Sequence, residues 1–184
     1  MTVLLESPSA QTIETFDRAM IALGGQPGRR LNDRNFGHLP PFRRSVVSRQ
    51  AAAEGNAFAA KQVGWQYLVK DSLGLAVVDV SDKITTTFSS VRRGPFANKY
   101  EAVLRRIDAD RGNAEEIFVP TILEVPQVGS CAVLVRGAQN TFAYPVILSG
   151  EFAPIECIDL AEFFEMAISP ASSLKSGGDL APKI

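Results

Sequence analysis

The chain has 184 residues, of which 46% are hydrophobic and 21% charged, and its formal net charge is -1. A chain of this size and composition buries a substantial core without disulfides or metal. The balanced charge gives no general reason to expect nucleic-acid or membrane binding. Two cysteines and one histidine are too few for a disulfide framework or a multi-histidine metal centre, so we expect no metal and no cofactor.

The N-terminal sequence lacks the basic start and the apolar run of a signal peptide, and no stretch reaches the roughly 18 consecutive apolar residues that span a membrane. We therefore expect a cytoplasmic protein. We also expect one globular domain over residues 1–168 and a flexible tail over residues 169–184, because the tail is rich in Ser, Gly and Pro.

The first third of the chain predicts two helices separated by a basic loop. Ser7 and Pro8 are typical of a helix start, and apolar residues at helical spacing then predict a helix over 8–23. Residues 26–42 are rich in Gly, Pro, Asn and Arg and predict a long structured loop. The alanine-rich segment 45–62 favours a second helix, which Gly55 weakens.

The middle of the chain predicts a hairpin, a further strand and a helix. Residues 65–69 and 75–80 flank a turn, and residues 83–91 suit another strand. Strand alternation favours a solvated, outward-facing Asp79, with a paired acid or a functional site as the alternatives. Asn98 is the expected N-cap of the helix that follows.

Residues 117–150 are the densest β-branched and aromatic region and predict three consecutive antiparallel strands. Pro120 and Pro145 cannot donate to a ladder, so each is expected at a bulge or facing outward. Cys131 is interpreted as a small buried hydrophobe rather than as a nucleophile paired with His38. A short helix follows the meander and ends at residue 169.

The predicted order of elements is α-α-β-β-β-α-β-β-β-α, which indicates an α+β fold with an antiparallel sheet of five or six strands and helices packed against it. Both faces of this sheet are apolar, and the prolines mark an exposed edge. These features favour a homodimer, in which a second copy covers the remaining apolar surface.

No phosphate-binding glycine loop, nucleophile elbow, dinucleotide-binding fingerprint or HExxH motif is present. We therefore favour a non-enzymatic module that binds a small ligand, acts as a sensor or binds a partner protein. The alternative is an enzyme acting on an anionic substrate that carries phosphate or carboxylate.

Two places in the chain combine arginines with glycine-rich backbone or aromatic residues, and guanidinium forks and free helix-start N–H groups suit anions. The competing interpretation is that these arginines are solvated or pair with the acidic segment 151–168. The predicted anion-binding residues are Arg92, Arg93, Gly94 and Asn98 at the helix start, and Arg29, Arg30, Arg34, Arg43 and Arg44 in and after the long loop.

Overall fold

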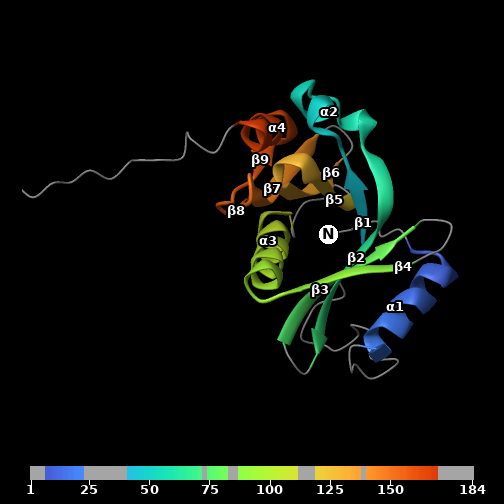
Figure 1. The fold of residues 1–184 in the computed structure, drawn as a ribbon. Coiled ribbons are helices and arrows are strands. Elements are labelled where there is room, and N and C mark those ends of the chain that lie inside the picture. The colour runs from blue at the N-terminus through green and yellow to red at the C-terminus, as the bar shows by residue number, and fades with distance from the viewer. Residues whose placement is uncertain are drawn as a thin grey trace, which may run out of the picture.

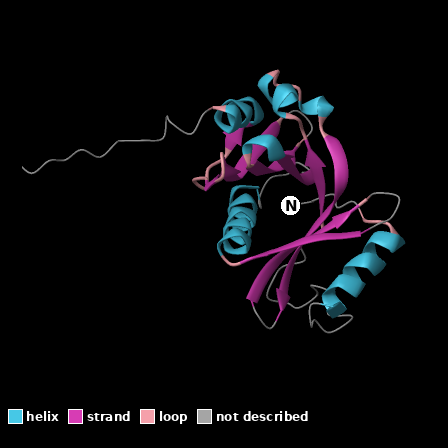
Figure 2. Ribbon diagram, in the orientation of Figure 1, coloured by secondary structure: helices cyan, strands magenta, loops and turns pink. Residues whose placement is uncertain are grey.

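The structure, a computed structural model, describes residues 7–22, 41–71, 74–82, 87–111, 119–137 and 140–169. These residues form helices packed on a large curled sheet, which confirms the mixed α+β class (Figures 1 and 2). The helices are α1 (Ala10–Ala22), α2 (Arg49–Ala53), α3 (Pro95–Arg111) and α4 (Leu160–Ile168), with short 3₁₀ turns at Ala57–Ala59 and Pro126–Val128. The strands are β1 (Phe42–Val46), β2 (Lys61–Asp71), β3 (Gly74–Ser81), β4 (Thr87–Arg93), β5 (Val119–Val125), β6 (Ser130–Arg136), β7 (Thr141–Leu148), β8 (Glu151–Phe152) and β9 (Ile158–Asp159).

The strand order is β4-β3-β2-β1-β5-β6-β7-β8, and β9 also pairs with β7. All pairs are antiparallel except β1 with β5, which run parallel. The prediction of five or six strands, all antiparallel, is therefore wrong. It omitted β1 and the two-residue strands β8 and β9. Strand β5 can run parallel to β1 because a long connection, through β2, β3, β4 and α3, separates the two strands. A tight hairpin joins only antiparallel strands.

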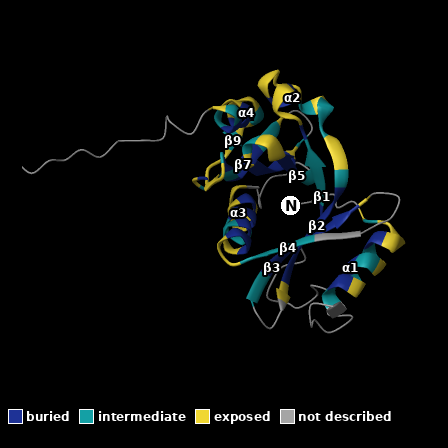
Figure 3. Ribbon diagram, viewed as in Figure 1, coloured by how far each residue is buried: buried dark blue, intermediate teal, exposed yellow. Residues whose placement is uncertain are grey.

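The sheet has two wings, which meet at β1 and β2 (Figure 1). Helix α3 lies between the wings, on what we call the inner face of the sheet, and its sheet-facing side is buried (Figure 3). Helix α1 covers the outer face of the β2–β4 wing, whereas α2 and α4 cover the outer face of the β5–β7 wing. Three apolar cores result, and the inner one contains side chains from both wings.

Gly64 of β2 lies where β2 pairs with both β1 and β3. The pairing of β1 with β2 shifts register between Arg44 and Ser45, next to this glycine. A Cβ added at Gly64 would lie only 2.0 Å from the backbone oxygen of Val80. The close approach of β2 to β3 at this point therefore requires glycine, which has no Cβ.

The predicted helix over 45–62 is wrong for most of its length. Residues up to Val46 belong to β1, and the helix is only the five-residue α2. Ser48 caps its start by accepting a hydrogen bond from the backbone N–H of Ala51 at 3.1 Å. Gly55 follows with a φ of 65°, a left-handed conformation that ends the helix early.

Two predicted helix starts also need correction. Helix α1 begins at Ala10 rather than residue 8, because Ser9 and not Ser7 accepts the N–H of Thr12, at 3.2 Å. Helix α3 begins at Pro95, so Asn98 is not its N-cap but an exposed residue of the first turn. Proline suits the first position of a helix because its missing N–H would have no partner there.

The predicted meander is confirmed as β5, β6 and β7. Pro145 lies at a bulge, where the register shifts between Cys131 and Ala132. Pro120 lies just before the residues of β5 that pair with β1, so its missing N–H removes no bond from that ladder. The hairpin of β2 and β3 is confirmed as well, with β2 longer than expected. The predicted tail, apart from Ser169, and residues 83–86 lie outside the described residues.

Candidate functional site

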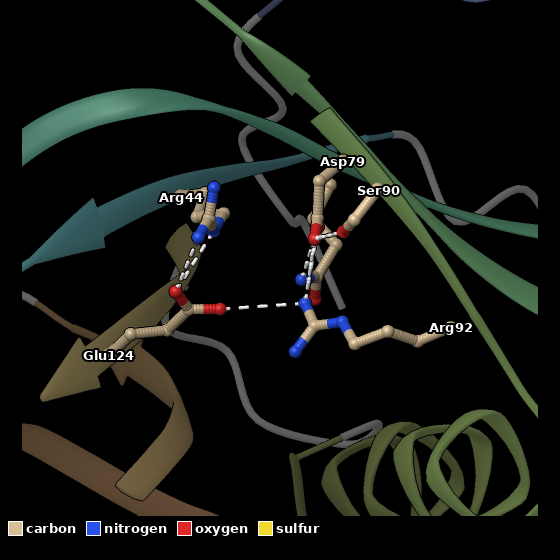
Figure 4. A network of polar contacts seen from close by, with 6 residues as sticks. Arg44, Asp79, Ser90, Arg92 and Glu124 are labelled. Atoms are coloured by element: carbon tan, nitrogen blue, oxygen red, sulfur yellow. Dashed lines mark hydrogen bonds and ion pairs between the residues drawn. The ribbon is translucent and has the colours of Figure 1, made fainter. Parts of the chain in front are cut away.

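The inner face carries a connected group of polar side chains at the junction of the two wings (Figure 4). We call this group the inner polar cluster. It lies on the same face as the apolar core around Tyr100 of α3, because neighbouring inner-core residues such as Leu68, Val77 and Ile122 stand two positions away on the same strands. Its members are Arg44 from β1, Gln66 from β2, Asp79 from β3, Ser90 and Arg92 from β4, and Glu124 from β5.

Asp79 lies at the centre of the β2–β4 half of the cluster and is only 2% exposed. Its carboxylate accepts hydrogen bonds from Gln66 Nε2 at 2.8 Å and Ser90 Oγ at 2.6 Å. Arg92 Nη2 lies 3.2 and 3.0 Å from its two oxygens. The predicted outward-facing position of Asp79 is therefore wrong, and pairing is the alternative that the structure shows. The reason is that helices cover both faces of β3.

Glu124 lies between two guanidinium groups and links the two halves of the cluster. Arg44 donates to its Oε2 through Nη2 at 2.7 Å and through Nε at 3.0 Å. Arg92 Nη2 reaches the other oxygen, Oε1, at 3.4 Å. The contact with Arg92 is the longest ion pair of the cluster, and it is the one that joins the β4 edge of one wing to β5 of the other.

Aromatic rings hold Arg92 in place from the side of α3. The guanidinium carbon of Arg92 lies 4.1 Å from the centre of the Phe96 ring, a close cation–π contact. Phe96 stacks on Tyr100 with ring centres 6.3 Å apart, and Tyr100 meets Phe42 edge-on. The orientation of the Arg92 guanidinium is thus fixed by carboxylates on one side and by a ring on the other.

Burial and charge act together on the titratable groups of this region. Burial alone would lower the pKa of the Arg44 guanidinium, but its hydrogen bond to Glu124 and the charges of Glu124 and Asp79 raise that pKa above its ordinary value. Burial raises the pKa of the Cys131 thiol to about 12, and Glu124 adds to the effect. Burial also raises the pKa of the Tyr100 phenol well above its ordinary value. Cys131 and Tyr100 therefore stay protonated at neutral pH, and the predicted burial of Cys131 is confirmed.

Three buried polar atoms in or beside the cluster have no hydrogen-bond partner among the described residues: Gln66 Oε1, Arg92 Nε and Tyr100 Oη. Gln66 and Arg92 bond to the same oxygen of Asp79, so their two unpartnered atoms lie near one carboxylate. The charges of Asp79, Arg92 and Glu124 also act on the Tyr100 phenol. Arg44 and Arg92 are partly accessible to solvent, since their side chains are 21% and 30% exposed.

The structure brings together two of the predicted anion-binding residues, Arg44 and Arg92, with Glu124 between them. Arg43 points to the opposite face of the sheet, where its guanidinium lies 5.9 Å from the Trp65 ring. Arg93 pairs in register with Ala76, a residue of the outer face. Gly94 forms the turn before α3, with a φ of 64°. The remaining predicted residues, Arg29, Arg30 and Arg34, and also His38, lie outside the described residues.

Sequence reasoning missed three members of the inner polar cluster, Gln66, Ser90 and Glu124, and also Tyr100 beside it. Gln66 and Glu124 share a signal that was available, since each is a single polar residue within a strongly apolar strand segment. Such a residue must be paired when helices cover both faces of the sheet. Tyr100 gave no such signal, because its position in α3 fits the apolar stripe.

In the part of the chain that the structure describes, no three His, Cys, Asp or Glu side chains come close enough to hold a metal ion together. No helix there is long and apolar enough to cross a membrane. Comparisons of the chain with protein families, with curated proteins and with solved structures each give no match.

Proposed function

We propose that the chain is a non-enzymatic, self-associating module that binds a small ligand, and that the inner polar cluster is its ligand-binding site. The observation that carries this proposal is the group of three unpartnered buried atoms around Asp79 and Arg92. Buried polar side chains are hydrogen-bonded in most native structures, and each one left without a partner costs about 1–3 kcal/mol. Three such atoms in one region support the proposal that a further molecule completes the cluster.

Access to the cluster supports the same proposal. Arg44 and Arg92 are partly exposed, whereas Asp79 and Glu124 beneath them are nearly buried. A small molecule would therefore contact these two guanidinium groups first. The unpartnered Nε of Arg92 is itself buried, so the Arg92 side chain must shift before this atom can donate to a ligand.

The alternative, an enzyme acting on an anionic substrate, would use the same two arginines. It would require the anion to replace Glu124 at Arg92, since the carboxylate now lies between the guanidinium groups. The 3.4 Å contact between Arg92 and Glu124 is the longest ion pair of the cluster and the one such an anion would break. The other predicted arginines would then contribute only if residues outside the described part of the chain reach this face.

Native mass spectrometry of the gently purified protein tests the proposed site. We expect a small-molecule adduct that is present in the native spectrum and lost on denaturation. Arg92→Gln should abolish the adduct, because it removes the Nε donor and the charge. Arg105→Gln is the matched control, since Arg105 forms an exposed ion pair with Glu101 on α3 away from the cluster. An adduct that both variants retain would show that the ligand binds elsewhere.

A further inference from the structure

We infer that the ligand of the inner polar cluster is a small, net-neutral molecule that presents both a hydrogen-bond donor and an acceptor, as an amide or a zwitterionic amino acid does. This inference rests on the proposed ligand-binding function and specifies the chemistry of the ligand. It follows from the charges of the cluster and from the hydrogen-bonding capacity of its unpartnered atoms.

The charges of the cluster are already balanced. Two guanidinium groups, of Arg44 and Arg92, face two carboxylates, of Asp79 and Glu124, and ion pairs of 2.7 to 3.4 Å connect them. An added anion would meet Arg92 but also the nearly buried Asp79. An added cation would meet the carboxylate of Asp79 but also the guanidinium group of Arg92. Unpaired charge is costly where water is largely excluded, so a ligand without net charge fits best.

The unpartnered atoms require both a donor and an acceptor from the ligand. Gln66 Oε1 only accepts, and its orientation is fixed because the amide Nε2 donates to Asp79 at 2.8 Å. Turning this amide over would place its oxygen against the carboxylate, which rules out the flipped assignment. Arg92 Nε only donates, whereas the Tyr100 hydroxyl does both. A ligand that donates an N–H to Gln66 Oε1 and offers an oxygen to Arg92 Nε would satisfy these atoms.

The surroundings of the cluster restrict the ligand further. Phe42, Phe96 and Tyr100 form a buried group of rings beside Arg92. These rings are packed in the inner core and are at most 9% exposed, so they leave no apolar surface for a large ligand to cover. The ligand is therefore compact and consists mainly of its polar head.

Four probes of similar size distinguish the ligand classes: acetamide, glycine, acetate and methylammonium, compared at equal ionic strength. The readout is the ¹H–¹⁵N NMR signals of the Gln66 side-chain amide and of Arg92 Nε–H in the wild-type protein. We expect acetamide and glycine to shift both signals, and acetamide to bind at least about tenfold more tightly than acetate or methylammonium. Gln66→Met should weaken acetamide binding, and Arg105→Gln should not.

Acetate binding as tightly as acetamide, or more tightly, would overturn the net-neutral class while leaving the ligand-binding function in place. Methylammonium binding most tightly would do the same. If none of the four probes moves either signal, both the class and the proposed function fail, and ordered water is the partner of the three atoms. Because the binding of all four probes is measured on the wild-type protein, the experiment distinguishes these outcomes even if Gln66→Met does not fold.

Discussion

Arg44 and Glu124 join the parallel strands β1 and β5 through two hydrogen bonds to a single carboxylate oxygen, at 2.7 and 3.0 Å. This pair stands where the β1 ladder meets the meander, and both side chains are mostly buried. Strand β1, which bears Arg44, was the hardest strand to predict, because it follows a basic loop and leads into an alanine-rich segment. The pair therefore fastens the β5–β7 wing to β1, where the two wings meet.

Glu124→Gln is expected to lower the free energy of unfolding by about 3 kcal/mol, because it leaves two guanidinium groups without their shared carboxylate. Glu101→Gln is the matched control. It breaks an exposed ion pair with Arg105 within α3, worth about 0.3–0.5 kcal/mol. Urea denaturation of both variants measures the difference. Equal losses in the two variants would show that Glu124 does not hold the wings together.

Leu134→Ala is expected to cost about 2–5 kcal/mol, because Leu134 is 1% exposed in the middle strand of the meander and its truncation leaves a cavity. The same denaturation experiment measures this change. A loss below about 1 kcal/mol, within the range of surface substitutions, would mean that the meander is not central to the fold.

Alkaline pH should destabilise the protein through Cys131. The folded-state pKa of its thiol is about 12, above the ordinary value of 9.0, so the folded state holds the proton more tightly than the unfolded chain. This contribution is fully present below pH 9 and is lost as pH rises toward 12, by up to about 1.4 kcal/mol per pH unit. The unfolding free energy of wild type should fall more steeply above pH 9 than that of Cys131→Ala. Parallel curves would contradict the burial of the thiol.

Self-association is predicted to involve Phe58, which is fully exposed on the 3₁₀ turn before β2. Among the described residues Phe58 is the most exposed large apolar side chain, so a partner that covers it would bury the most apolar area per residue. Sedimentation velocity at micromolar concentration should show a dimer, and Phe58→Asp should shift it toward monomer. Wild-type protein that sediments as a monomer would remove the prediction of a homodimer.

The sequence predicted those elements whose signal is local. The meander is dense in β-branched residues, and α3 carries an apolar stripe of the right period, so both were found. Strand β1 depends instead on partners far along the chain, β2 and β5, and a short segment with two arginines has no local pattern that indicates it. The burial of Asp79 likewise depends on a distant element, because α3 covers the inner face of β3.

The candidate site could be predicted only in part. Arg44 and Arg92 were identified as possible ligand-binding residues, but as members of two separate groups. Their meeting through Glu124 follows from the curl of the sheet, which no spacing in the sequence reveals. The carboxylates that neutralise them change the expected ligand from an anion to a net-neutral molecule.

A crystal structure of the protein with acetamide tests the ligand-binding role of the inner polar cluster most directly. We predict that the acetamide oxygen accepts a hydrogen bond from Arg92 Nε and that its amide nitrogen donates to Gln66 Oε1. Both contacts should fall within ordinary hydrogen-bond distance, about 2.7–3.2 Å. Electron density that shows only ordered water, or other protein atoms, on these two groups would contradict the role of the cluster as a ligand-binding site.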